Sequence, residues 1–72
     1  MHYIFDLSIS REEMLKFYSG SARSVHARDR GGRRVAFPAQ ALRRFVGPYG
    51  VQGTFRLEVD GQGRLRRVDQ LM

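Results

Sequence analysis

Cysteine is absent from this 72-residue chain, and no long hydrophobic run occurs in it. Without cysteine the chain forms neither a disulfide framework nor a cysteine-based zinc site. Without an apolar stretch of about 18 residues it has no predicted membrane-spanning helix. Residues 1–6 also lack the basic start and apolar stretch of a secretion signal. We therefore expect a cytoplasmic protein that makes no contact with a membrane.

The length predicts one small domain over residues 1–72. The hydrophobic fraction is 42%, and five Phe and three Tyr favour a packed core over disorder. A domain of this size buries only about 60% of its unfolded surface, so its stability is expected to be small. Formation of a homodimer is a second way to bury surface, and it stays open as an alternative.

The first third of the chain predicts a strand followed by a helix. Polar and apolar residues alternate over 3–9, which is typical of a half-buried strand. Ser10 and Glu13 then have the spacing of a capping box, and Gly20 is suited to ending the helix. This helix carries Met14, Leu15, Phe17 and Tyr18, and its aromatic rings are expected in the core.

Residues 23–29 and 33–37 predict a hairpin whose register follows from side-chain parity. The apolar residues of both strands must share one face, and a two-residue Gly-Gly loop would place them on opposite faces. A three-residue loop, Arg30-Gly31-Gly32, satisfies this condition. It places Val25, Ala27, Val35 and Phe37 on the core face, and sets Arg28 opposite Arg34 and His26 opposite Ala36 on the other face.

The remainder of the chain predicts a helix and two strands. Pro38 is suited to the first position of a short helix that runs to Val46. A strand follows at 51–60, where Gly53 indicates a bulge or a close backbone approach. From Arg64 the apolar spacing breaks strict alternation, which predicts a strand with a bulge or a short helical end.

The predicted fold class is α+β with the order β-α-β-β-α-β-β. We expect one mostly antiparallel sheet and two short helices. The preferred architecture is a split-βαβ sheet with an added edge hairpin. In it, a helical crossover returns to a parallel strand. A small, partly open β-barrel with the helices as plugs is the alternative.

The basic charge is concentrated in one segment. The formal net charge is +6, and residues 23–44 alone contain seven arginines and one acid, Asp29. The rest of the chain contains six basic and six acidic residues. A concentrated basic segment is typical of a protein that binds a polyanion. Twelve of the thirteen basic residues are Arg and Asn is absent, so a coding bias toward Arg is the competing explanation.

We therefore predict a non-enzymatic module that binds RNA, DNA or another polyanion through an arginine-rich hairpin. The candidate residues are Arg23, His26, Arg28, Arg30, Arg33, Arg34, Arg43 and Arg44. Arg43 and Arg44 also suit the last turn of the second helix for a structural reason, because cations there complement the helix dipole. The alternative function is a protein-interaction module or a homodimer that uses an exposed sheet edge.

Catalytic and metal-binding patterns are missing from the sequence. His2 lies at the terminus and His26 on a strand, and no hydroxyl is spaced to form a triad with either. No helical His pair or acidic calcium loop is present, and the glycines do not form a phosphate loop. We expect no cofactor, no metal and no catalytic residue.

A family resemblance rests on short stretches spread over nearly the whole chain. They are Phe5-Asp6-Leu7, Ser10-Arg11-Glu12-Glu13, Phe17-Tyr18-Ser19-Gly20, Ala27-Arg28-Asp29, Gly32-Arg33-Arg34-Val35, Phe37-Pro38-Ala39, Leu42-Arg43, Phe45-Val46 and Gly50-Val51-Gln52-Gly53. Together they resemble a family of short bacterial proteins known only as a domain of unknown function. The resemblance implies a small bacterial cytosolic protein, and it transfers no functional residue to this chain.

Overall fold

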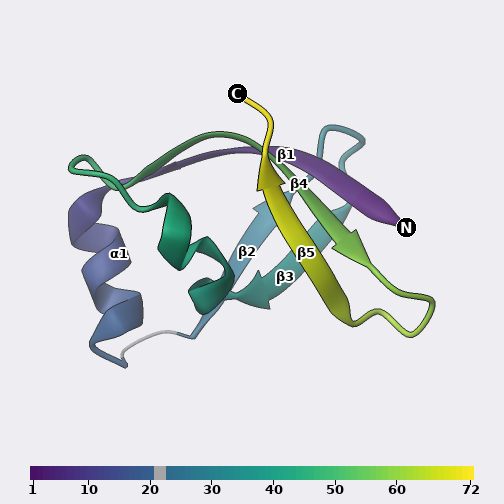
Figure 1. The fold of residues 1–72 in the computed structure, drawn as a ribbon, viewed down its shortest axis with the longest axis horizontal. Coiled ribbons are helices and arrows are strands. Elements are labelled where there is room, and N and C mark those ends of the chain that lie inside the picture. The colour runs from purple at the N-terminus through teal and green to yellow at the C-terminus, as the bar shows by residue number, and fades with distance from the viewer. Residues whose placement is uncertain (21–22) are drawn as a thin grey trace.

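The computed structural model describes residues 1–20 and 23–72, which form five strands and two short helical segments (Figure 1). In chain order these are β1 (His2–Ile9), α1 (Arg11–Tyr18), β2 (Ser24–Arg28), β3 (Arg34–Pro38), the 3-10 helix η1 (Ala39–Phe45), β4 (Val51–Val59) and β5 (Leu65–Gln70). The predicted α+β class and the predicted order of elements are confirmed.

The strands form two antiparallel sheets, one with the order β1-β4-β5 and one containing β2 and β3. The expected split-βαβ arrangement with a parallel return is wrong, because β1 pairs antiparallel with β4 from His2–Glu58 to Ile9–Val51. The chain after α1 enters the separate hairpin sheet. Over the described ranges the two sheets do not close into a barrel.

The core lies between the inner faces of the two sheets. Phe5 of β1 is fully buried and joins them, because its ring lies 5.5 Å from that of Phe37 in β3 and 6.4 Å from that of Phe55 in β4. Phe45 of η1 packs edge-on against Phe55 at 5.2 Å. Figure 1 shows α1 and η1 together at one side of the strands. Their buried side chains include Met14 from α1 and Leu42 from η1.

The predicted capping box at the start of α1 is confirmed. The Ser10 hydroxyl accepts a hydrogen bond from the Glu13 N–H at 3.2 Å, and the Ser10 N–H donates to the Glu13 carboxylate at 3.4 Å. Gly20 follows the helix with a φ of 87°, as a left-handed C-terminal residue. No helix within the described residues is long and apolar enough to cross a membrane.

Leu15 and Tyr18 of α1 lie outside the core, which corrects the prediction for the Tyr18 ring. Leu15 is 54% exposed and Tyr18 is 45% exposed. Met14 is buried and Phe17 packs against the core, and they lie three residues apart on one side of the helix. Leu15 and Tyr18 form the next row around the helix, about 100° away, and that row faces outward.

The predicted strand after residue 64 and its irregularity are confirmed. β5 pairs with β4, and the register shifts between Glu58 and Val59, so that β5 has one extra residue there. The close backbone approach predicted at Gly53 is also present. Its φ is 141°, and a side chain there would collide with the Met72 carbonyl oxygen.

The second helix is present, but Pro38 is not its first residue as predicted. It ends β3 and lies at the N-cap of η1, which begins at Ala39.

Candidate nucleic-acid interface

The predicted register of the arginine hairpin is confirmed. Val25 pairs with Phe37 and Ala27 with Val35 on the core side, where all but the half-buried Ala27 are fully buried. The Asp29 N–H donates to the Arg33 carbonyl at 2.9 Å, and this bond closes the three-residue loop. Gly32 in that loop has a φ of 86°, which a side chain would disfavour.

The outer face of β2 and β3 carries two exposed arginines on neighbouring strands. We call it the hairpin face, and its residues are His26, Arg28, Arg34 and Ala36, all of them exposed. Arg28 lies directly opposite Arg34, and His26 opposite Ala36. Among residues 1–20 and 23–72, neither Arg28 nor Arg34 forms an ion pair. A shallow hollow of about 530 Å³ lies over these four residues.

The two arginines near the hairpin tip have a different role, because both contact the first sheet. Arg30 lies 3.1 Å from the Asp6 carboxylate of β1, and its backbone N–H donates to the Ile4 carbonyl at 2.9 Å. The guanidinium of Arg33 donates to the His2 carbonyl at 3.2 Å and lies 4.5 Å from the centre of the Tyr3 ring. These contacts hold the hairpin tip on β1.

Asp29 is the acid that fixes the tip from within the hairpin. Its carboxylate is buried and accepts hydrogen bonds from the backbone N–H and from Nε of Arg33, both at 2.7 Å. Burial acts to raise the pKa of Asp29, but these hydrogen bonds and the Arg33 charge outweigh it and hold the pKa below its usual value. Asp29 therefore neutralises Arg33 and leaves the Arg28–Arg34 pair without a counter-charge.

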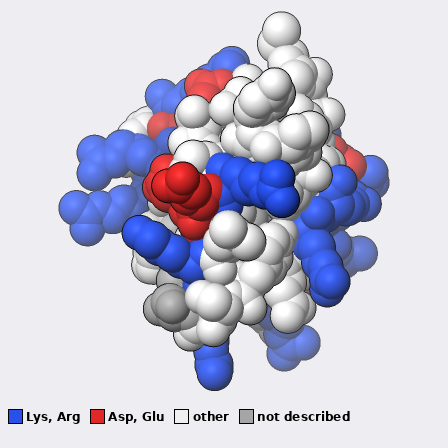
Figure 2. All heavy atoms as spheres, turned by 90° about the vertical axis from the view of Figure 1, so that its left-hand side faces the viewer, with Lys and Arg blue, Asp and Glu red and all other residues white. Residues whose placement is uncertain are grey.

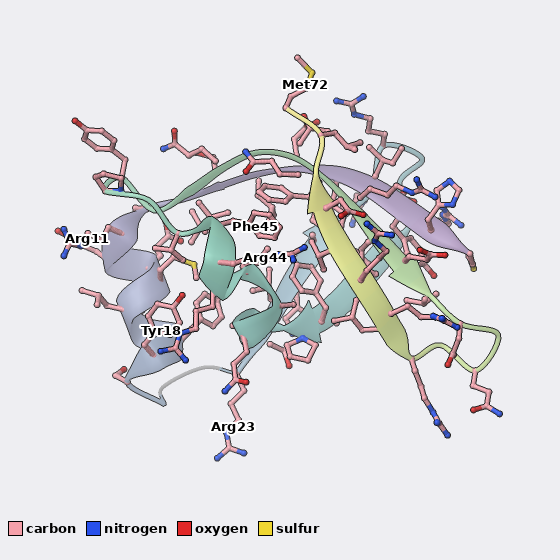
Figure 3. The ribbon with its side chains drawn as sticks, viewed as in Figure 1. Arg11, Tyr18, Arg23, Arg44, Phe45 and Met72 are labelled. Atoms are coloured by element: carbon pink, nitrogen blue, oxygen red, sulfur yellow. The ribbon has the colours of Figure 1, made fainter. Side chains whose placement is uncertain are left out.

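Arg44 belongs to the structure of the fold. Its guanidinium donates to the Val68 carbonyl of β5 and lies 4.7 Å from the centre of the Phe45 ring. Figure 3 shows Arg44 beside Phe45, between η1 and β5. Arg23 instead extends away from the molecule at the base of the hairpin (Figure 3), and Arg43 is also exposed. Both Arg23 and Arg43 line a second cavity, between α1 and η1.

The outer face of the three-stranded sheet is also charged, but its charges alternate in sign. We call it the sheet face, and its residues are Arg56, Glu58, Arg67 and Asp69. Arg56 pairs with Asp69 in the strand register, and Glu58 with Arg67. Arg67 also forms an ion pair with Asp69 at 2.8 Å, which raises the pKa of Arg67 above its usual value.

The eight candidate residues therefore separate into three groups. Arg30, Arg33 and Arg44 hold parts of the fold together, whereas His26, Arg28 and Arg34 lie on the hairpin face. Arg23 and Arg43 lie at the hairpin base beside the cavity. Figure 2, which views the molecule from the α1 side, shows basic side chains in several separate patches with acidic ones among them. Basic side chains thus do not form one continuous surface on this side.

The cavity at the hairpin base adds residues that the sequence analysis did not identify as site candidates. Phe17 and Tyr18 of α1 line it, together with Gln40 of η1. In the sequence, Phe17 and Tyr18 look like core residues of a helix, and Gln40 looks like an ordinary polar residue.

Within the described residues, no three His, Asp or Glu side chains gather as they would around a metal ion.

These observations define a small α+β domain with two antiparallel sheets and a basic, unpaired hairpin face. Its sequence matches the family model described as Protein of unknown function (DUF2835) over residues 1–71. The chain therefore belongs to this family. Neither the curated proteins nor the solved structures contain a match to it.

Proposed function

We propose that this domain is a nucleic-acid-binding module of the bacterial cytoplasm, and that it binds without catalysing a reaction. The observation that carries the proposal is the Arg28–Arg34 pair, in which two exposed arginines face each other across a hairpin and have no acidic partner in the described parts of the chain. Two like charges opposite each other destabilise a strand pair by roughly 0.2–1 kcal/mol relative to a neutral pair. A phosphate group between the two guanidiniums would remove this repulsion and accept hydrogen bonds from both.

The surroundings of the pair support a ligand of extended shape. Ala36 is small, so its side chain does not fill the hollow of about 530 Å³ over the hairpin face. His26 adds a further donor beside it. No acidic residue lines this hollow among the described residues, so nothing there repels a phosphate backbone.

The alternative role, pairing of an exposed sheet edge with a protein or a second copy, has less support. β5 is an edge strand of the three-stranded sheet. Its sequence carries Arg66 and Arg67, and the register shift against β4 interrupts its regular geometry. Charged side chains and bulges are features that keep edge strands from pairing with other chains.

The test compares two double charge reversals that lower the net charge equally. Arg28→Glu with Arg34→Glu changes the hairpin face, and Arg64→Glu with Arg66→Glu changes exposed residues outside the basic segment. We expect the hairpin variant to lose nearly all affinity for a short RNA or DNA oligonucleotide in fluorescence anisotropy, and the control variant to keep most of it. Circular dichroism and thermal unfolding establish that both variants fold.

An equal loss of affinity in both variants would mean that only the net charge attracts the oligonucleotide. That result would contradict the proposal. A protein that binds no oligonucleotide even at low salt, and that dimerises with concentration in sedimentation experiments, would contradict it in favour of the interaction role.

A further inference from the structure

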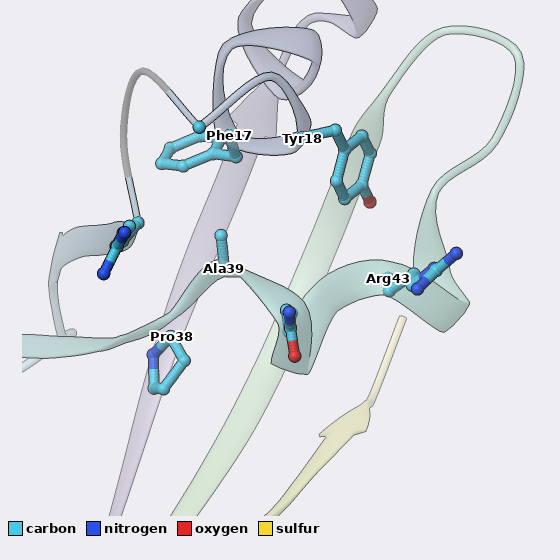
Figure 4. Close-up of a pocket in the computed structure, with 8 residues that line it drawn as sticks. Phe17, Tyr18, Pro38, Ala39 and Arg43 are labelled. Atoms are coloured by element: carbon cyan, nitrogen blue, oxygen red, sulfur yellow. The ribbon is translucent and has the colours of Figure 1, made fainter.

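A cavity of about 610 Å³ lies where the C-terminal end of α1 meets the beginning of η1. Figure 4 shows the rings of Phe17 and Tyr18 on the α1 side and Ala39 and Arg43 on the η1 side, with Pro38 next to Ala39. Arg23, Gly20 and Gln40 complete the lining. The cavity is therefore bordered by segments that lie about twenty residues apart in the chain.

The lining combines aromatic and cationic groups. Tyr18 is 45% exposed although it is a large ring on a helix, and Phe17 is half-buried. Arg23 and Arg43 have no ion-pair partner in the part of the chain that the structure describes, and the described lining contains no acid. An exposed ring is a stacking surface for a flat base, and the guanidiniums suit a phosphate. The combination fits a nucleotide.

The cavity and the hairpin hollow are separate, but residues of β3 border both of them. Arg34, Ala36 and Pro38 alternate with the buried Val35 and Phe37, so they lie on one side of the strand. Arg34 and Ala36 border the hairpin hollow, whereas Pro38 borders the cavity. The distance along the strand from Arg34 to Pro38 is about 13 Å, at about 3.3 Å per residue. A ligand that spans both sites is thus a short chain of nucleotides.

We propose that the cavity binds one unpaired base of a single-stranded nucleic acid whose backbone continues onto Arg28 and Arg34. Tyr18 is the stacking residue, and Arg23 and Arg43 contact the adjoining phosphates. This inference rests on the proposed function and narrows it to single strands. The bases of a duplex are already paired and stacked, so they are not available to enter the cavity.

The test uses Tyr18→Ala and a matched control, Tyr49→Ala. Tyr49 is 80% exposed in a loop and does not line the cavity, so its removal also takes away one exposed ring. Anisotropy titrations use single-stranded RNA and DNA oligonucleotides and a duplex of equal length. We expect wild type to prefer single strands, Tyr18→Ala to lose about tenfold in affinity for them, and Tyr49→Ala to bind like wild type.

A second variant reports on the cavity directly. The chain contains no tryptophan, so Tyr18→Trp introduces a single fluorophore at the stacking position. It is expected to retain single-strand affinity, and its fluorescence is expected to change on titration with the same Kd as the anisotropy. Equal binding by Tyr18→Ala and Tyr49→Ala, or an unchanged fluorescence while the oligonucleotide binds, would overturn the inference. Either result leaves the hairpin proposal standing, because that depends on the Arg28 and Arg34 variants.

Discussion

The hairpin face and the sheet face are built from the same kinds of parts but arrange their charges in opposite ways. Both are outer faces of antiparallel strands, and both expose arginines. On the sheet face Arg56 lies across from Asp69 and Arg67 across from Glu58. On the hairpin face Arg28 lies across from Arg34. The number of arginines therefore does not show which face is a binding surface. The two faces differ in the residue that lies across from each arginine.

The same distinction applies within the basic segment itself. Arg30 and Arg33 have the acids Asp6 and Asp29 within ion-pair distance, and they fasten the hairpin tip to β1. The Arg30–Asp6 pair is exposed on both sides. Such pairs contribute only about 0–1 kcal/mol to stability. The fold depends on the shared core instead, and neither charged face is required for it. Substitutions on either charged face are therefore expected to leave the fold intact.

The largest expected effect comes from the residue beneath both faces. Phe5 is fully buried and stacks on Phe37 of the hairpin and Phe55 of the larger sheet. Phe5→Ala is expected to reduce the free energy of unfolding by about 3–5 kcal/mol, because it removes a large side chain and leaves a cavity between the sheets. Urea denaturation measures the change. If one sheet of the Phe5→Ala variant unfolded at the same urea midpoint as in wild type, the two sheets would not share a single core.

Acid is expected to loosen the tip of the hairpin. The hydrogen bonds and charge of Arg33 outweigh burial and keep the pKa of Asp29 below its usual value of 3.8. A carboxyl whose pKa is lower in the folded state stabilises the protein above the unfolded pKa, and this stabilisation is lost as the pH falls through the folded pKa. Stability should therefore decrease below about pH 4, as the pKa of Asp29 implies.

Asp29→Asn is the variant that assigns this acid dependence. It removes the titrating carboxyl, so thermal unfolding between pH 2 and pH 6 is expected to show a shallower decline than in wild type. Asp60→Asn is the control, since the pKa of Asp60 is lowered by the backbone N–H groups of Arg64 and Gln62 in the turn between β4 and β5, outside the hairpin. Identical curves for wild type and Asp29→Asn would show that Asp29 does not hold the tip.

The hairpin register could be predicted because it depends on neighbouring residues. Val25, Ala27, Val35 and Phe37 had to share one face, and only an odd loop allowed this. The pairing of β1 with β4 was not predicted, because it joins segments about fifty residues apart. Long-range pairing depends on how the whole core packs.

Which arginines hold the fold together and which stay exposed also depends on long-range contacts. A structural role for Arg44 was open from its place in the last turn of the helix, but its contact with the backbone carbonyl of Val68 could not be predicted. Tyr18 was predicted to be buried, because an apolar ring on a helix usually is. Its position beside Arg43 follows from the meeting of α1 with η1, which no local pattern indicates.

A smaller effect on stability tests the comparison of the two faces itself. Arg34→Thr removes one charge of the like pair, and we expect it to raise the free energy of unfolding by about 0.2–1 kcal/mol. Arg67→Thr is the matched control, because it introduces the same strand-favouring side chain where the arginine has an acidic partner. We expect the gain to be larger for Arg34→Thr and to shrink in 1 M salt. Equal changes in both variants would show that strand propensity alone is responsible.

The most direct test of the account is the salt dependence of single-strand binding by Arg28→Ala with Arg34→Ala. Each phosphate contact on a single strand contributes about −0.7 to the slope of log affinity against log salt. If the two hairpin arginines each contact a phosphate, the slope of the double variant should be shallower than that of wild type by about 1.4. Arg64→Ala with Arg66→Ala should leave the slope unchanged. A hairpin variant with the wild-type slope would contradict the assignment of Arg28 and Arg34 as phosphate contacts.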